Sequence, residues 1–147
     1  MNQALLSSGT VEWETPQDFF DALDAEFDFT LDPCSTDKNA KCAKHYTKDD
    51  NGLEQDWKGE RVWCNPPYGR EMPLWIEKCY KHGIQGGVAV MLLPARTDTR
   101  AFHEYIWHKA EIRFIKGRLK FGNAGNPAPF PSMVVIFDGR SGKARGN

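Results

Sequence analysis

Residues 87–94 read Gly-Val-Ala-Val-Met-Leu-Leu-Pro, an apolar run that contains no charged or polar side chain. A strand that shows no alternation of apolar and polar residues is covered on both faces, as in the parallel sheets of α/β proteins. The run is far shorter than the roughly 20 residues that a bilayer-spanning helix needs. It therefore predicts a buried central strand and no membrane segment.

Helical and strand signals alternate along the chain around this run. A helix is expected from the capping pair Thr15-Pro16 to Phe27, because Phe19, Leu23 and Phe27 repeat at helical spacing. Two further helices are expected over residues 73–82, closed by Gly83, and over residues 98–108. Short strands are expected over residues 29–31, 61–64, 111–116 and 132–137.

This order of elements predicts an α/β sandwich with a mostly parallel sheet and an antiparallel C-terminal hairpin at its edge. Ligands of such sheets bind at the carboxyl ends of the strands. Three expected strand ends carry polar or rigid loops, at Asp32-Pro33, at residues 65–68 and at residues 94–96. We therefore expect the functional site on the rim where these loops meet.

The composition indicates one domain. The chain has 147 residues, 40% of them hydrophobic and 27% charged, which is typical of a soluble globular domain. We expect a flexible arm over residues 1–10, one domain over 11–138 and a flexible basic tail over 139–147. Residues 1–10 lack the basic start and apolar centre of a signal peptide, so a cytoplasmic protein is expected.

Cysteine spacing and charge indicate which metals and partners the protein could bind. The four cysteines form no C-x-x-C pair, so we expect reduced thiols and no metal site. Residues 1–95 hold 9 basic and 16 acidic residues, whereas residues 96–147 hold 10 basic and 4 acidic ones. The basic half could meet phosphates, and ordinary solvated charges would explain it equally well.

The tetrapeptide Asn65-Pro66-Pro67-Tyr68 directly follows the strand expected over residues 61–64. Two successive prolines cannot continue a strand ladder, and they make the loop stiff. Taken alone, the tetrapeptide is either a rigid turn whose asparagine caps its own backbone or a rigidly held polar site.

In this position the tetrapeptide resembles the catalytic motif of the S-adenosylmethionine-dependent methyltransferases that modify exocyclic or amide nitrogens. The adenine amino group is a poor nucleophile, because its lone pair is delocalised into the ring. The resemblance implies that the Asn65 side-chain oxygen and the Pro66 carbonyl accept its two hydrogens, while Pro67 stiffens the loop. Tyr68 would stack on the substrate base. In-line methyl transfer needs positioning more than a strong base.

The resemblance covers most of residues 11–138 and is to the small Dam-like DNA adenine methyltransferases of phages and prophages. Trp13-Glu14-Thr15-Pro16 resembles the motif that holds the methionine part of the cofactor, although a helix cap alone explains Thr15-Pro16. Asp32 and Pro33 stand where the family has an acidic residue after its first strand. Asp56 resembles the acidic residue that binds the cofactor's adenine. Either carboxylate could also be an ordinary solvated one.

Two departures from the family pattern affect the cofactor site. Residues 34–37 read Cys-Ser-Thr-Asp in place of a glycine-rich loop, and Ser35 and Asn39 are expected to substitute for it. The stretch between Asp32 and Asp56 is also too short for an ordinary βαβ crossover and a further strand. The resemblance therefore implies a Rossmann-like methyltransferase sandwich with a shortened N-terminal half.

For the DNA side, the resemblance implies a flipped adenine held between Tyr68 and an aromatic residue of the last hairpin. Phe121 is expected in that role and Phe130 competes for it. Basic side chains near the rim would bind phosphates of double-stranded DNA, although each could simply be solvated surface. They are Arg96, Arg100, Arg118 and Lys120. No room remains for a separate recognition domain, so sequence specificity is expected to be loose, or to come from loops 96–101 and 117–131 or from the second subunit of a homodimer.

The resemblance thus implies an enzyme that methylates N6 of adenine in DNA in a bacterial host cell, for protection from restriction or for regulation. Two alternatives stay open. The same tetrapeptide serves methyltransferases of RNA adenine or protein glutamine, and the missing glycine-rich loop would also fit a binding module that has lost catalysis.

Overall fold

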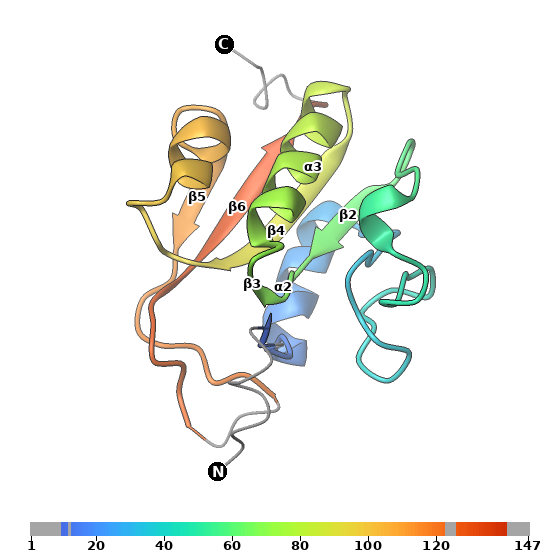
Figure 1. Ribbon diagram of the computed structural model, residues 1–147. Coiled ribbons are helices and arrows are strands. Elements are labelled where there is room, and N and C mark those ends of the chain that lie inside the picture. The colour runs from blue at the N-terminus through green and yellow to red at the C-terminus, as the bar shows by residue number, and fades with distance from the viewer. Residues whose placement is uncertain (1–9, 12, 123–125, 141–147) are drawn as a thin grey trace.

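The computed structural model describes residues 10–11, 13–122 and 126–140, and its centre is one mixed sheet (Figure 1). The strand order is β2-β4-β6-β5, with β2 Arg61–Cys64, β4 Val88–Pro94, β6 Ser132–Asp138 and β5 Glu111–Phe114. β2 runs parallel to β4, with Arg61 opposite Val88. β6 is antiparallel to both of its neighbours. The arm residues 1–9 and the tail residues 141–147 lie outside the described residues.

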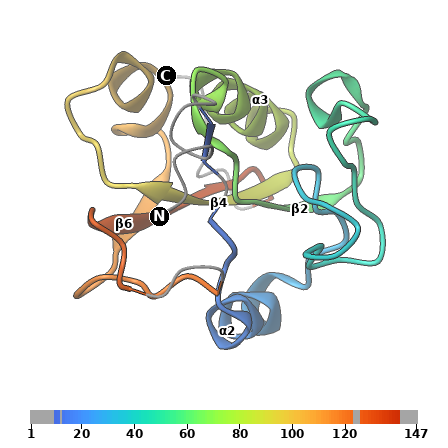
Figure 2. The same cartoon turned by 60° about the horizontal axis from the view of Figure 1, so that its bottom comes forward.

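Helices cover both faces of this sheet. α2 (Gln17–Phe27) lies on one face and α3 (Met72–Ile84) on the other (Figure 2). Along β4, Ala89, Met91 and Leu93 belong to the core under α3, while Val88, Val90 and Leu92 belong to the core over α2. The period-two pleat therefore sends alternate residues of one apolar run into two cores, which confirms that β4 is a central strand.

The sheet differs from the expected one in one respect and agrees in another. Only one of the three pairings among the four described strands is parallel, so "mostly parallel" is wrong. The expected antiparallel hairpin is present at the edge of the sheet, with β5 outermost and β6 between β5 and β4. Residues 132–137 are accordingly as fully buried as β4, whereas β5 is more exposed.

Three element boundaries also differ. Residues 29–31 form no strand but only a bridge from Leu31 to Val62, because Pro33 ends the pairing. α3 runs through Gly83 to Ile84, so Gly83 lies in its last turn, and the Gly83 carbonyl would lie 2.0 Å from a Cβ on Gly139, which marks a close backbone approach at Gly139. The helix expected over 98–108 is a short π-helical turn, η2 (Phe102–Ile106).

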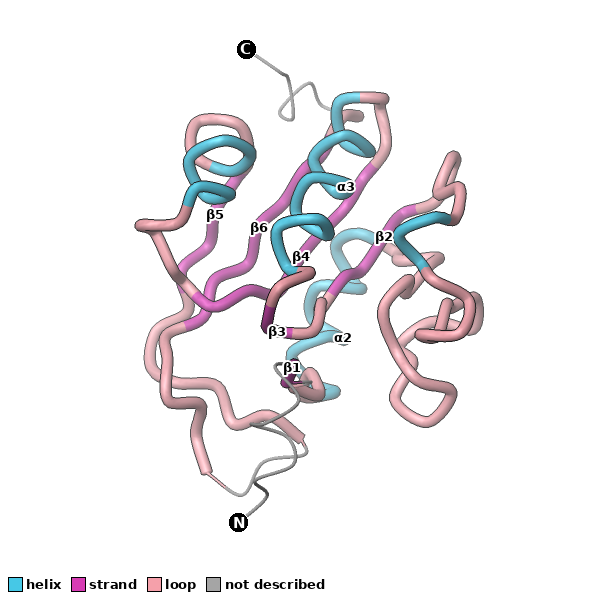
Figure 3. Tube along the Cα trace, in the orientation of Figure 1, coloured by secondary structure: helices cyan, strands magenta, loops and turns pink. Residues whose placement is uncertain are grey.

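The N-terminal segment is tied to the loop after β2. Strand β1 (Thr10–Val11) pairs antiparallel with β3 (Tyr68–Gly69), as the trace shows below α3 (Figure 3). Thr10, placed by the sequence in a flexible arm, is therefore paired with Gly69. At the other end, the Gly139 amide donates to the Gly87 carbonyl at 2.8 Å, so the last described residues are also attached to the sheet.

A long irregular segment follows Leu31 beside β2. Within it the structure has one bridge, Asp32 to His45, and one 3-10 turn, η1 (Gly52–Glu54). Among the residues that the structure describes, no helix has the length and apolar character needed to cross a bilayer.

Candidate active site

The Asn65-Pro66-Pro67-Tyr68 loop leaves β2 at the carboxyl end of the parallel strand pair. Its backbone turns at once, because neither proline can donate to β4. Pro66 and Tyr68 are buried, whereas Asn65 and Pro67 are half-buried and line a cavity of about 470 Å³. The structure thus places the tetrapeptide at the rim that the sequence indicates, next to a hollow of ligand size.

The Asn65 amide has one end bound and the other end open. Its Nδ2 donates to the carbonyl of Trp13 and, at 2.9 Å, to the hydroxyl oxygen of Thr15. Its Oδ1 is buried and has no hydrogen-bond partner among the described residues. An unpaired buried acceptor is costly, so it indicates a donor that arrives with a ligand.

Two more buried polar atoms in the same cavity lack a partner among the described residues. They are the Ser35 hydroxyl and the indole N–H of Trp75 on α3. Charged side chains of both signs line the cavity as well, namely Glu14, Asp32, Lys41, Lys48, Arg70 and Glu71. The cavity therefore suits a ligand that carries hydrogen-bonding groups and charges of both signs.

Asp32 closes the loop that borders this cavity. Its carboxylate accepts the backbone N–H of Lys41 at 3.0 Å and that of Cys34 at 3.3 Å. Burial raises the pKa of Asp32, while these backbone donors lower it. Asp32 and Pro33 both line the cavity, so the structure brings them to the same hollow as Asn65.

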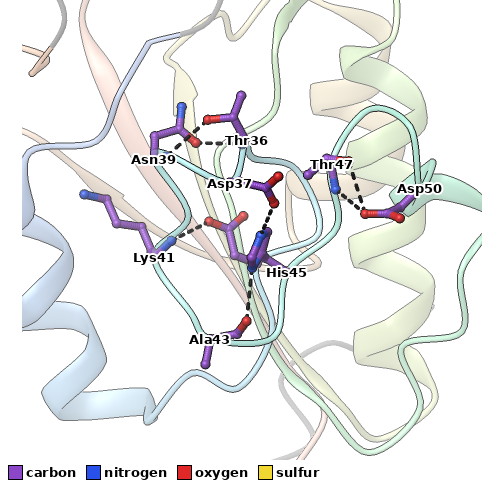
Figure 4. A network of polar contacts seen from close by, with 9 residues as sticks. Thr36, Asp37, Asn39, Lys41, Ala43, His45, Thr47 and Asp50 are labelled. Carbon is purple, nitrogen blue, oxygen red and sulfur yellow. Dashed lines mark hydrogen bonds and ion pairs between the residues drawn. The ribbon is translucent and has the colours of Figure 1, made fainter.

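Side chains also hold the loop that stands in place of a glycine-rich turn (Figure 4). Thr36 and Asn39 bond reciprocally, the Thr36 amide to Asn39 Oδ1 at 2.8 Å and the Asn39 amide to Thr36 Oγ1 at 3.1 Å. The His45 ring bonds Asp37 at 2.8 Å and the Ala43 carbonyl at 3.0 Å. Asn39 lines the cavity, but its side-chain oxygen is already used inside the loop.

Two expected cofactor residues, Asp56 and Pro16, do not line the cavity. Asp56 is exposed, does not line the cavity, and accepts the backbone N–H of Lys58 at 2.9 Å. The neighbouring Trp57 takes the inward position and stacks on Trp75. Among the N-terminal residues, Trp13 and Thr15 line the cavity, while Pro16 only precedes α2.

The aromatic rings beside the tetrapeptide form a cluster. Trp13 lies 5.3 Å from Phe121 and 5.4 Å from Phe130, and Tyr68 lies 5.3 Å from Phe130, between ring centroids. Phe121 is only 1% exposed and packs in the core over α2. Phe130 is therefore nearer than Phe121 to the position that faces Tyr68.

A second cavity, of about 720 Å³, lies between α3 and η2, and Tyr68 lines this cavity and not the first one. Arg96 and Arg100 line it, and Arg100 is paired with Glu104. Burial raises the pKa of the Tyr68 phenol, and its hydroxyl has no partner among the described residues. Arg118 and Lys120 are exposed on the loop before β6.

Sequence reasoning misses two kinds of cavity residue. The periodicity predicts Trp75 only as a core position of the second helix, although an indole carries a polar N–H that needs a partner when buried. Lys41 and Arg70 belong to no motif, although they lie near Asp32 and the tetrapeptide loop in the chain. Proximity to those two segments is the signal that could have found them.

A mixed α/β sheet with a partly polar cavity where its parallel strands end is the arrangement of nucleotide- and cofactor-binding α/β enzymes. The chain belongs to the family described as DNA N-6-adenine-methyltransferase (Dam), whose model matches residues 4–139.

Two relatives agree with this family. The chain is 31% identical over 134 residues to the "DNA N-6-adenine-methyltransferase" of Escherichia phage T1. The aligned region covers 90% of this chain and 56% of the phage protein. It is 40% identical over 65 residues to the "Putative methyltransferase YfdM" of Escherichia coli (strain K12), over 39% of this chain and 70% of that protein. The chain thus spans little more than half the length of the phage relative.

Proposed function

We propose that this chain transfers the methyl group of S-adenosyl-L-methionine to N6 of adenine in double-stranded DNA. The observation that carries the proposal is the Asn65 side chain, whose amide nitrogen is held while its buried oxygen has no partner among the described residues. Membership of the Dam family and the name of the phage T1 relative support the choice of substrate.

The cavity fits the proposed cofactor by its chemistry. S-Adenosyl-L-methionine, when bound, supplies an activated methyl group on a sulfonium, and it carries an ammonium, a carboxylate, ribose hydroxyls and an adenine. Carboxylates and ammonium groups line the cavity together, and the Ser35 hydroxyl and Trp75 N–H offer unused polar atoms. We infer that Trp13, Asp32, Pro33, Ser35 and Trp75 hold the cofactor, with Thr15 bonded to Asn65 beside them and Asn39 shaping the loop.

On the substrate side, Asn65 and the Pro66 carbonyl would accept the two hydrogens of the adenine amino group. Accepting both draws the lone pair toward nitrogen, which makes that nitrogen a better nucleophile. Tyr68 would stack on the flipped base, with Phe130 and Trp13 as the neighbouring rings. Arg96 and Arg100, which line the second cavity, and the exposed Arg118 and Lys120 on the loop before β6 would bind DNA phosphates.

The fold supports the same proposal at a finer level. The antiparallel β6 between β4 and β5 and the helices on both faces fit a Rossmann-like methyltransferase sandwich. The segment between Leu31 and β2 fits its shortened N-terminal half, because it holds one bridge and one 3-10 turn. We propose that the enzyme works in the cytoplasm of a bacterial host cell, where its DNA substrate is, and that a second subunit contributes to DNA specificity.

The proposal is tested by offering three substrates side by side: unmethylated duplex DNA, RNA and a glutamine-containing peptide, each with S-adenosyl-L-methionine. Cofactor binding is measured in parallel by calorimetry. Methylation of DNA adenine supports the proposal, and transfer only to RNA or to the peptide overturns it in favour of that substrate. Cofactor binding without any transfer indicates a binding module that has lost catalysis.

A further inference from the structure

The side chain of Asn65 is held by two acceptors from the N-terminal segment. Because a carbonyl can only accept, the Trp13 carbonyl decides which end of the amide faces the cavity, while the Thr15 hydroxyl, which can also donate, holds the amide in place. The two acceptors are the Trp13 carbonyl and the Thr15 hydroxyl oxygen, and both contact Nδ2. Thr15 is 5% exposed, so water does not compete freely for this bond. The oxygen and nitrogen ends of an asparagine amide have nearly the same shape but opposite hydrogen-bonding roles. The hydrogen-bond partners around the amide therefore determine which end points where.

Rotating the amide by half a turn would place Oδ1 against the Trp13 carbonyl. Two acceptors would then face each other in a buried place, and the donor would point at the position of the incoming amine. The observed orientation avoids both problems. It presents a bare acceptor, Oδ1, with no partner among the described residues.

We propose that Thr15, together with the Trp13 carbonyl, is a positioning residue that locks the Asn65 amide with its oxygen toward the target amine. This inference rests on the proposed function of Asn65 and deepens it. The place of Thr15 in the N-terminal motif implies a direct contact with the cofactor. The role proposed here is a different one. Thr15 acts on the transfer step through Asn65.

The backbone around these residues supports the assignment. β1 pairs with β3, so the segment before Trp13 is attached to the end of the tetrapeptide loop itself, with Val11 opposite Tyr68. Thr15 directly precedes the residue before α2, whose buried face anchors it to the sheet. Thr15 is therefore held between two fixed points, as a residue that orients another must be.

The test compares Thr15→Val, which keeps the shape and removes the hydroxyl, with Thr15→Ser, which keeps the hydroxyl. The rate of transfer at saturating cofactor and DNA should fall roughly tenfold to hundredfold in Thr15→Val. The cofactor dissociation constant should stay within about twofold of the parent value, because the lost bond is to Asn65 and not to the cofactor. Thr15→Ser should restore most of the rate. Weaker cofactor binding with an unchanged saturated rate would overturn the proposal.

A second readout does not depend on activity. In nuclear magnetic resonance spectra, the Asn65 side-chain N–H₂ signals are identified by their absence in Asn65→Ala. In Thr15→Val one of the two proton signals should shift and exchange faster with water, and in Thr15→Ser neither should. Unchanged signals in Thr15→Val would contradict the positioning role. If the parent protein methylates no DNA, the proposed function fails, and these signals still decide whether Thr15 holds Asn65.

A third variant covers the case in which Thr15→Val does not fold. Asn65→Asp replaces the donor with an oxygen, which would lie against the Trp13 carbonyl. Transfer at saturation should then be lost while the cofactor dissociation constant changes little. A fully active Asn65→Asp variant would show that the donor end of the amide is not needed, and it would overturn the proposal.

Discussion

The indole ring of Trp13 lies beside the phenol ring of Tyr68, with centroids 6.3 Å apart and planes inclined by 40°. Phe130 flanks Tyr68 at 5.3 Å, whereas Phe121 contacts Trp13 and Phe130. The base sandwich expected from the sequence, Tyr68 with Phe121, therefore has Trp13 and Phe130 in the nearer positions. Trp13 and Phe130, and not Phe121, are therefore the rings that would lie beside a base stacked on Tyr68.

Tyr68→Phe should leave methyl transfer almost unchanged and should stabilise the fold. The Tyr68 hydroxyl is buried without a partner among the described residues, so its removal relieves a desolvation cost of about 1–3 kcal/mol and breaks no bond. The ring face needed for stacking is kept. Initial rates and thermal melting check this, with Tyr68→Ala as the control that removes the ring. A large loss of rate in Tyr68→Phe, similar to that of Tyr68→Ala, would show that the hydroxyl itself takes part.

Gly52→Ala should weaken cofactor binding strongly. A Cβ on Gly52 would lie 2.0 Å from the Pro33 carbonyl oxygen and 3.0 Å from the Trp75 ring, so the cavity wall would have to move. Overpacking of this kind costs about 1–3 kcal/mol of stability. Gly122→Ala is the matched control, because its Cβ would meet only ordinary contacts with Glu14 from 3.5 Å outward. Calorimetric titration compares the two variants, and equal cofactor affinities would contradict the role of Gly52 in the cavity wall.

The unfolding free energy should carry a pH-dependent contribution from His45. Its hydrogen bonds to Asp37 and to the Ala43 carbonyl raise its pKa, so the charged ring stabilises the folded state. This contribution is complete below the ordinary histidine pKa of about 6.5 and is lost as the pH rises through the raised value. It should be below about 1 kcal/mol, because the partner Asp37 is exposed.

Urea unfolding at several pH values measures this contribution as the difference between the parent and His45→Gln. The difference is needed because burial lowers the pKa of His82, which changes stability with pH in the opposite direction. If the stability difference between parent and His45→Gln grew with rising pH, the charged His45 ring would not be the stabilising form.

Arg96→Ala should reduce DNA affinity more than Arg100→Ala. Both side chains are exposed beside the second cavity, but Arg100 is paired with Glu104 at 2.5 Å. Among the described residues Arg96 has no ion-pair partner, so its charge is available to a phosphate. The salt dependence of binding, measured as log K against log salt, should lose a slope of about 1 in Arg96→Ala. Equal slopes for parent and Arg96→Ala would remove Arg96 from the DNA-binding surface.

The sequence predicted the layers of the fold and the C-terminal hairpin. It did not predict that most strand pairings in the sheet are antiparallel. The helical spacing of apolar residues in α2 and the continuous apolar run of β4 are local patterns, and the sequence shows such patterns directly. The interior place of β6 depends on pairing between distant segments. Residues 133–137 of β6 form an uninterrupted apolar run, shorter than that of β4, and this run was the signal that distinguished β6 from an edge strand.

The candidate site was predictable where rigid or unusual residues mark it, as in the Asn65-Pro66-Pro67-Tyr68 loop. The cofactor loop was less predictable, because specific side-chain bonds shape it, such as those of Asp32 and of Thr36 with Asn39. Such bonds leave no periodic pattern. Asp56 shows the limit of a motif match, because its neighbour Trp57 takes the inward position.

The most direct test of the central claim concerns the Asn65 oxygen. Parent protein and Asn65→Ala are incubated with unmethylated duplex DNA and S-adenosyl-L-methionine, and the digested nucleosides are analysed by mass spectrometry. We expect N6-methyladenine from the parent and a loss of at least about a hundredfold in Asn65→Ala, with cofactor affinity nearly unchanged. Formation of N6-methyladenine by Asn65→Ala at the parent rate would contradict the proposed mechanism.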